Sequence, residues 1–162
     1  MSVPAILEKF KPIIHVPREE PDCQLIDVLF ELRPRYMILW YHWPNDDYTG
    51  KPDYEPVILF LKANQLVAIG IRPHTKYKHA LRWVTEGSRP VIIFTTAWHG
   101  PMINHGRIRD AFAASFSLSA IAERIDDYSL ISGIPPPWYI TDDANVSVYD
   151  YADRIARELG IP

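Results

Sequence analysis

Two apolar runs, residues 57–61 and 66–71, are separated by only four residues, and this spacing limits the fold more than any other feature. Each run is too short for a typical helix, whereas a connection of this length commonly joins paired antiparallel strands. The sequence therefore predicts a β-hairpin here. Because the runs contain almost no polar residues, both faces of the hairpin are expected to be partly buried.

Prolines and aromatic residues are abundant, with 15 prolines, five Trp, nine Tyr and six Phe in 162 residues. Proline interrupts helices, so this composition indicates short elements joined by stiff loops rather than a helical bundle. Apolar residues make up 48% and charged residues 23%, as in ordinary globular proteins. A chain of this length can bury a core without disulfides or zinc, so residues 1–162 are expected to form a single domain.

Three further segments have the composition of strands. Residues 36–43, between Pro34 and Pro44, are rich in aromatic and β-branched side chains and predict a buried strand. Residues 13–16 and 91–96 predict two shorter strands.

Helices are expected near both ends of the chain. Residues 2–10 predict a short helix with Ser2 as its N-cap. Apolar side chains at helical spacing over residues 148–159, followed by Gly160, predict a C-terminal amphipathic helix. Residues 135–137, all proline, predict an extended connector.

Two segments fit both a helical and an alternating pattern, residues 24–32 and 109–125, and helix is favoured in each. The predicted fold class is α+β. A mostly antiparallel sheet or small β-sandwich is expected over residues 36–96, with helices from the C-terminal third packed on it.

Charge and cysteine content exclude several classes of protein. The net charge is −3 with no run of Lys or Arg, so nucleic acid is not an expected partner. The apolar runs 36–43 and 57–61 are far shorter than the roughly 18 residues that indicate a membrane span. No signal-peptide pattern is visible at the N-terminus, and Cys23 is the only cysteine. The expectation is a cytoplasmic protein with a reduced Cys23.

The hairpin places several ionisable residues at its open end. Residues two apart in a strand share a face, so Asp53 and Glu55 project their carboxylates together. If Lys62 lies opposite Gln65, the register continues to Glu55 opposite Arg72 and Asp53 opposite His74. A turn shifted by one residue brings Glu55 opposite His74 instead.

These side chains are candidate metal ligands, with Asp46 in the preceding loop as a third carboxylate. Carboxylates and water suit Ca²⁺, Mg²⁺ or Mn²⁺, whereas ligation by His74 or His99 favours a transition metal. Calcium or magnesium is expected ahead of zinc. An alternative without metal remains open, in which Glu55 forms an ion pair with Arg72, Asp53 caps a turn and His74 is solvated.

Aromatic residues crowd the same segments. Tyr48 and Tyr54 lie in or beside the loop and are candidate ligand contacts with Arg72, because flat rings beside a polar pocket stack on sugars. The tryptophans Trp40, Trp43 and Trp98 are expected in the core. The glycine-rich nucleotide-binding motifs, the nucleophile elbow and H-E-x-x-H are absent from the sequence.

Four stretches resemble the necrosis- and ethylene-inducing peptide-like family and its vacuolar protein sorting-associated relatives with an Asp-Trp-Glu motif. The match spans roughly residues 36–104. The stretches are residues 40–46 (WYHWPND), 50–55 (GKPDYE), 67–69 (VAI) and 74–78 (HTKYK). The family has a Tyr-x-Trp-Pro-Lys-Asp run, a Gly-His-Arg-His-Asp-Trp-Glu heptapeptide and a later Gly-His-Gly-Lys-Tyr.

The resemblance implies a β-sandwich that holds a divalent cation through acidic residues, here Asp46, Asp53 and Glu55. His99 is similar in position to a histidine of the family. Lys51 and Pro52 replace the histidines that precede the family's aspartate, and the cysteine pair of secreted members is missing. Plant-cell lysis is therefore not implied.

Three functional hypotheses follow. The first is a divalent-metal-binding domain with a small-ligand pocket at loop 44–54, in one version hydrolytic through a metal-bound water. The second is a non-catalytic module that binds a carbohydrate or other small molecule around a structural cation. The third is an interaction protein without metal that forms a homodimer through a sheet edge.

Overall fold

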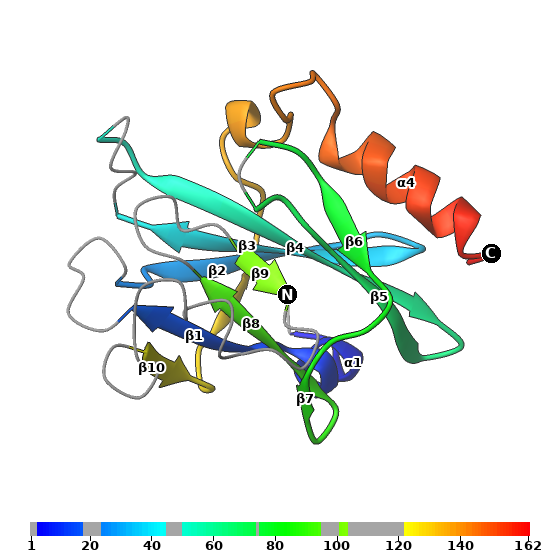
Figure 1. Cartoon of the computed structure of the whole chain (residues 1–162), viewed down its shortest axis with the longest axis horizontal. Coiled ribbons are helices and arrows are strands. Elements are labelled where there is room, and N and C mark those ends of the chain that lie inside the picture. Colours follow the sequence, from blue (N-terminus) through cyan, green and yellow to red (C-terminus); the bar gives the residue numbers. More distant parts are fainter. Residues whose placement is uncertain (1–2, 18–23, 45–49, 74, 95–100, 104–121) are drawn as a thin grey trace.

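The computed structural model describes residues 3–17, 24–44, 50–73, 75–94, 101–103 and 122–162. They form two β-sheets, with a helix at the C-terminal end of the chain (Figure 1). This is the predicted α+β class, and the arrangement is sandwich-like. In the described part of the chain, no helix has the length and apolar character needed to cross a membrane.

The larger sheet has six strands. Their order is β11 (Leu130–Ser132), β2 (Asp27–Leu32), β3 (Tyr36–Trp43), β4 (Asp53–Lys62), β5 (Gln65–Ile71) and β6 (Lys78–Ala80). All neighbours are antiparallel except β11 and β2, which run parallel. The predicted strand at 36–43 and the predicted hairpin are confirmed as β3 and as β4–β5.

The smaller sheet has five strands. Its path is β10 (Ala122–Ile125), β1 (Ile13–Pro17), β8 (Arg89–Phe94) and β7 (Thr85–Glu86), and β9 (Pro101–Ile103) also pairs with β8. Strands β1 and β8 are parallel, and the other pairs are antiparallel. The predicted strand at 13–16 is confirmed, and so is the one at 91–96 as far as Phe94. Residues 95 and 96 lie outside the described chain.

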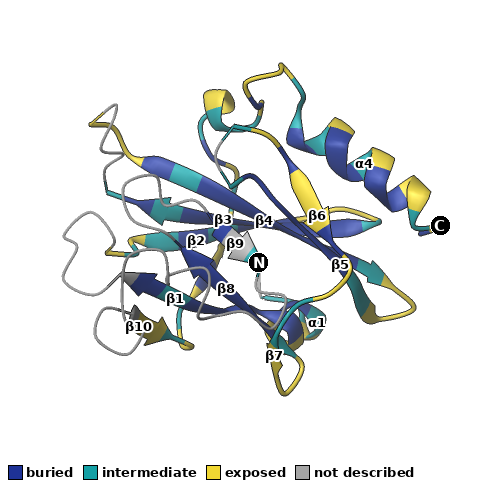
Figure 2. Cartoon of the chain, in the orientation of Figure 1, coloured by how far each residue is buried: buried dark blue, intermediate teal, exposed yellow. Residues whose placement is uncertain are grey.

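The main core lies between the two sheets (Figure 2). Alternate residues of the central strands point into it, as the period of two requires. Its members include Ile14, Val16, Val28, Phe30, Leu39, Tyr41, Val57, Leu59, Ile69, Ile92 and Phe94. Helix α1 (Ala5–Phe10) adds Leu7 and Phe10 to this core. The predicted N-terminal helix is thus present, although Ser2 lies outside the described residues and the N-cap is Pro4.

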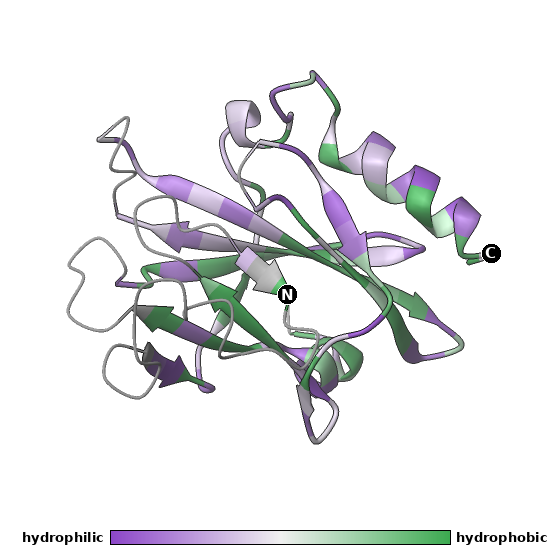
Figure 3. Ribbon diagram, in the orientation of Figure 1, coloured by the Kyte–Doolittle hydropathy of each residue, from purple (hydrophilic) through white to green (hydrophobic). Residues whose placement is uncertain are grey.

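A second core covers the outer face of the larger sheet. Helix α4 (Val148–Glu158) packs Tyr151, Ala152 and Ile155 against Ile38 and Ile58 of β3 and β4. Figure 3 shows hydrophobic and hydrophilic positions alternating along α4, as the predicted amphipathic helix requires. The Ser147 side chain accepts a hydrogen bond from the backbone of Tyr149, and Gly160 at φ 67° follows the helix. Strands β3 and β4 are therefore buried on both faces.

Two helix predictions are wrong. Residues 27–32 form strand β2, because Val28 and Phe30 point into the main core while Glu31 points toward α4. Residues 122–125, the end of the predicted helix 109–125, form strand β10 paired with β1. Residues 109–121 lie outside the described chain. The predicted connector 135–137 is extended at Pro136, and Pro137 begins the 3₁₀ helix η2 (Pro137–Tyr139).

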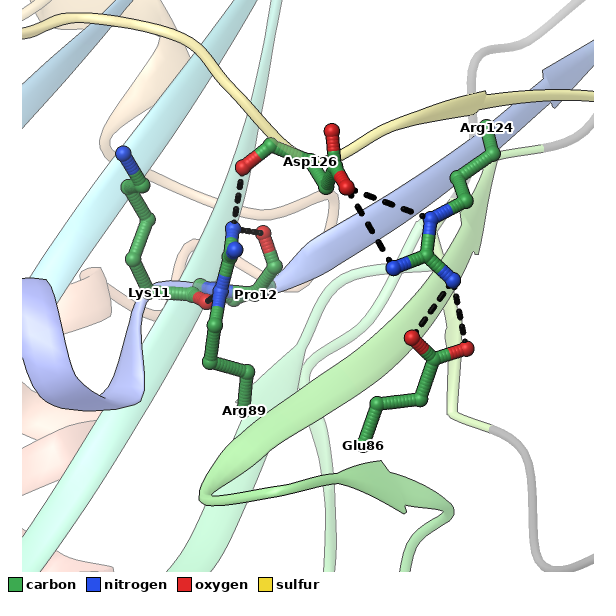
Figure 4. Close-up of polar contacts among 6 residues, drawn as sticks. All are labelled: Lys11, Pro12, Glu86, Arg89, Arg124 and Asp126. Carbon is green, nitrogen blue, oxygen red and sulfur yellow. Dashed lines mark hydrogen bonds and ion pairs between the residues drawn. The ribbon is translucent and has the colours of Figure 1, made fainter.

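A polar network joins segments that are distant in sequence (Figure 4). Arg89 of β8 donates to the backbone carbonyls of Lys11 at 2.7 Å and Asp126 at 2.5 Å. Arg124 of β10 forms an ion pair with Glu86 of β7 at 2.5 Å. Arg89 thus ties β8 to the junction between α1 and β1, and Arg124 ties β10 to β7.

The β4–β5 turn places an alanine in the left-handed region. Ala63 has φ 49° and Asn64 has φ 60°, the pattern of a two-residue turn in which glycine is favoured at positive φ. A side chain with a Cβ is strained there by about 1 kcal/mol.

Ala63→Gly is therefore expected to raise the free energy of unfolding by roughly 0.5–1 kcal/mol, measured by urea denaturation. Ala144 is an exposed turn residue without positive φ and provides the matched control. Ala144→Gly should be neutral or destabilising, because it only adds freedom to the unfolded chain. Equal effects of the two substitutions would contradict the explanation by strain.

Candidate functional site

Asp53 and Glu55 lie at the beginning of β4. They pair across the strands with Trp43 and Tyr41 of β3, and side chains of such pairs share a face. Trp43 and Tyr41 pack in the main core. Both carboxylates therefore occupy the inner face of the larger sheet, at one end of the sandwich.

Burial makes this pair of acids chemically distinctive. Asp53 and Glu55 are each only 7% exposed, and neither residue is without an interaction partner. Burying an ionised carboxylate is costly unless cations or hydrogen-bond donors compensate it. Two such groups on one strand, two residues apart, form a site suited to a positively charged ligand.

The predicted register holds only near the turn. Lys62 lies opposite Gln65 as expected, but a shift between Phe60 and Leu61 brings Val57 opposite Ile71. Neither predicted register continues beyond this irregularity. Because a slip of one residue moves a side chain to the other face of a strand, Arg72 does not join Glu55.

Arg72 lies instead on the outer side of the sheet, where it is 8% exposed. Its guanidinium donates to the carbonyl of Tyr139 at 2.5 Å, to the hydroxyl of Tyr77 at 3.2 Å and to the carbonyl of Tyr54 at 3.4 Å. These bonds join β4, the end of β5 and η2. Among the described residues, Arg72 therefore bonds to three tyrosines and does not form the ion pair with Glu55 that was considered from the sequence.

Tyr54 also lies on the outer face, away from Asp53. Its ring stacks on His42 at a centroid distance of 4.1 Å and meets Tyr139 at 5.0 Å. The Nδ1 atom of His42 is 3.0 Å from Oδ1 of Asp27. This group of His42, Tyr54, Tyr139 and Asp27 was not predicted as a unit, since it depends on a cross-strand register that the sequence does not state.

Four predicted site residues, Asp46, Tyr48, His74 and His99, lie outside the described residues. Among the residues that are described, no group of three or more His, Cys, Asp or Glu side chains could hold a metal ion. Asp53 and Glu55 provide hard oxygen ligands of the type that Ca²⁺ and Mg²⁺ prefer. They fit such a cation in donor type, and a shell of six or more ligands would need further donors.

The buried tryptophans follow the prediction where they are described. Trp40 and Trp43 are fully buried in the two cores. Trp98 lies outside the described residues. The side chain of Trp138, which was not singled out from the sequence, is 67% exposed on η2 and packs against Tyr139 at 5.5 Å.

Comparison with solved structures identifies the fold. The chain is similar to NLPPya in complex with glucosamine, at 16% identity and a TM-score of 0.51, with 94% of this chain and 76% of that chain covered. NLPPya in complex with mannosamine gives 16% identity and a TM-score of 0.50 with the same coverage. A mutant of NLPPya gives 17% identity and the same score.

These matches confirm the fold that the sequence resemblance implies, that of the necrosis- and ethylene-inducing peptide-like toxins, over most of the chain. No family model matches the sequence. The comparison with curated proteins gives no match either.

Proposed function

We propose that this chain is a non-catalytic module that binds small glycans, amino sugars in particular, at the Asp53–Glu55 end of the sandwich. The observation that carries the proposal is the pair of buried carboxylates on the inner face of β4. An amino sugar is a cation at neutral pH, and its ammonium group complements these acids. NLPPya, which has the same fold, is found with two amino sugars, glucosamine and mannosamine.

A divalent cation is the second part of the proposal. Asp53 and Glu55 would hold it, and Asp46, His74 and His99 are the candidates to complete its shell. Such an ion would orient sugar hydroxyl groups by direct coordination. With Asp46 as a third carboxylate, its two positive charges would leave one negative charge for the ammonium group of the sugar. The comparisons support this binding hypothesis better than hydrolysis by a metal-bound water.

The test uses Asp53→Asn, which keeps the shape of the side chain and removes its charge. Glucosamine binding, measured by isothermal titration calorimetry in calcium-containing buffer, should weaken by about tenfold or more, because a hydrogen bond to a charged group contributes roughly 1.5–3 kcal/mol. Asp150→Asn, the same change at an exposed position of α4, should leave binding unchanged. N-acetylglucosamine, which lacks the ammonium charge, should bind more weakly than glucosamine.

Thermal unfolding with and without chelator tests the cation separately. If a cation binds only the folded state, its removal at a hundredfold excess over Kd lowers the free energy of unfolding by about 2.7 kcal/mol. Asp53→Asn should abolish this chelator effect. Equal glucosamine affinity in the wild type and in Asp53→Asn would contradict the proposed site, and chelator-sensitive turnover of model esters or phosphoesters would favour the hydrolytic hypothesis.

A further inference from the structure

A cleft of about 420 Å³, the turn cleft, lies at the end of β4 opposite Asp53. Its walls come from the β2–β3 turn, the β4–β5 turn, the start of α1 and the last two residues of the sequence, Ile161 and Pro162. In Figure 1 this is the end of the sandwich beside the label C. The volume is within the range of small-molecule sites, about 300–1,000 Å³.

The charged side chains that line the turn cleft are all positive. Arg33, Arg35 and Lys62 are among its fourteen lining residues, and no Asp or Glu is. The whole chain has a net charge of −3, so this cluster opposes the overall sign. Charged side chains of one sign in a cleft concentrate the field and attract ligands of the opposite sign.

Contacts within the protein fix the side chains of Arg33 and Lys62 but use only some of their N–H donors. Arg33 is 3.5 Å from the carboxylate of Glu31 and lies over the ring of Tyr149 at 4.3 Å, while Lys62 donates to the carbonyl of Leu159 at 3.4 Å. A guanidinium has five N–H donors and an ammonium three. Arg35 is partly buried and forms no ion pair with any described residue. Donors from two different turns thus remain for a ligand.

Most of the remaining wall is apolar. Ile6, Met37 and Ile161 line the cleft, and Leu32 beside them is 43% exposed. A ligand with only a charged group would leave this apolar surface in water. A ligand with a short hydrocarbon part would cover it.

We propose that the turn cleft binds a small anionic amphiphile, whose carboxylate or phosphate group contacts Arg35 and Lys62 and whose hydrocarbon part packs on Ile6 and Leu32. Arg33, held by Glu31 and Tyr149, provides a third fixed donor. The site is independent of the proposed glycan site at the other end of β4.

Titration with octanoate, followed by ¹H–¹⁵N NMR, tests the proposal. Chemical shifts should change around residues 33–35 and 61–64, and octanol, which has the same chain without the charge, should bind at least about tenfold more weakly. Arg35→Gln should weaken octanoate binding by a similar factor. Arg157→Gln removes the same charge from an exposed position at the end of α4 and should have no effect.

A vesicle experiment distinguishes the source of the anion. Cosedimentation with phosphatidylcholine vesicles that contain phosphatidylglycerol, lost in Arg35→Gln but kept in Arg157→Gln, assigns the cleft to a lipid headgroup. Octanoate binding without cosedimentation assigns it to a free anion. The proposal is overturned if octanol binds as tightly as octanoate with no vesicle binding, if Arg157→Gln weakens binding as much as Arg35→Gln, or if the shifts lie elsewhere.

Discussion

Glu31→Ala is expected to lower the free energy of unfolding by about 2–4 kcal/mol, because this buried carboxylate joins the larger sheet to α4. Glu31 is 7% exposed. One oxygen accepts from the indole nitrogen of Trp40 at 2.7 Å, and the other accepts from the hydroxyl of Tyr149 at 2.6 Å. Without the acceptor, the fully buried indole N–H of Trp40 loses its partner, and α4 loses its tie to β2.

Urea denaturation of a small set of variants distinguishes the loss of the Glu31 hydrogen bonds from the loss of side-chain packing. Glu31→Gln keeps an amide oxygen as acceptor and should cost less than Glu31→Ala. Trp40→Phe removes the stranded donor, so adding it to Glu31→Ala should cost less than the sum of the two single changes. Glu158→Ala is the control, since its pair with Arg154 is exposed and 4.0 Å long, and should change stability by less than about 0.5 kcal/mol. A loss in Glu31→Ala no larger than this control would refute the assigned role.

The same tie explains why β2 was mistaken for a helix. A strand with one solvated face alternates apolar and polar residues, and this alternation identifies it in a sequence. In β2 the outer face is covered by α4, so Leu29 packs against the second core while Val28 and Phe30 enter the first. Apolar residues on consecutive positions then satisfy helical spacing as well. The assignment depends on a helix more than 110 residues away in the sequence.

The β4–β5 hairpin could be predicted because its information is local. Two apolar runs and a short connection determine the pairing, and the residues that close the turn, Lys62 and Gln65, lie where expected. The irregularity between Phe60 and Leu61 has no signal in the sequence, since no glycine or proline marks it. That single shift moved Arg72 away from the acids and into its bonds with Tyr77 and Tyr139.

The candidate site was predictable only in part for a related reason. The period of two correctly placed Asp53 and Glu55 on one face of β4. The period of two does not show whether Asp53 and Glu55 are on the inner or the outer face. The inner face is defined by the smaller sheet, which is built from residues 13–17, 85–94, 101–103 and 122–125. Burial of the two acids, and the position of Tyr54 on the opposite face, follow from that second sheet.

Stability is expected to fall steeply between about pH 10 and pH 12, since buried tyrosines are protonated in the folded state. Burial holds the pKa of Tyr41 well above its usual value and raises the pKa of Tyr77 to about 12. In the unfolded chain both phenols ionise near pH 10. Between these values the unfolded state binds fewer protons, so unfolding becomes more favourable as the pH rises.

Each such phenol lowers the free energy of unfolding by about 1.4 kcal/mol per pH unit, so Tyr41 and Tyr77 together contribute about 2.7 kcal/mol per unit. Tyr128, whose pKa is also raised by burial, donates to the carbonyl of Pro12 and adds to the slope. A domain with an ordinary stability of 5–15 kcal/mol would lose much of it by pH 12.

The measurement is urea denaturation at pH 9, 10 and 11, with tyrosinate absorbance at 295 nm recorded through each transition. Tyr77→Phe should reduce the slope by about 1.4 kcal/mol per unit, because it removes one titrating group and retains the ring that stacks on Tyr151 at 5.0 Å. If all nine tyrosines ionise near pH 10 while the protein stays folded, the phenols of Tyr41 and Tyr77 are not protected by burial.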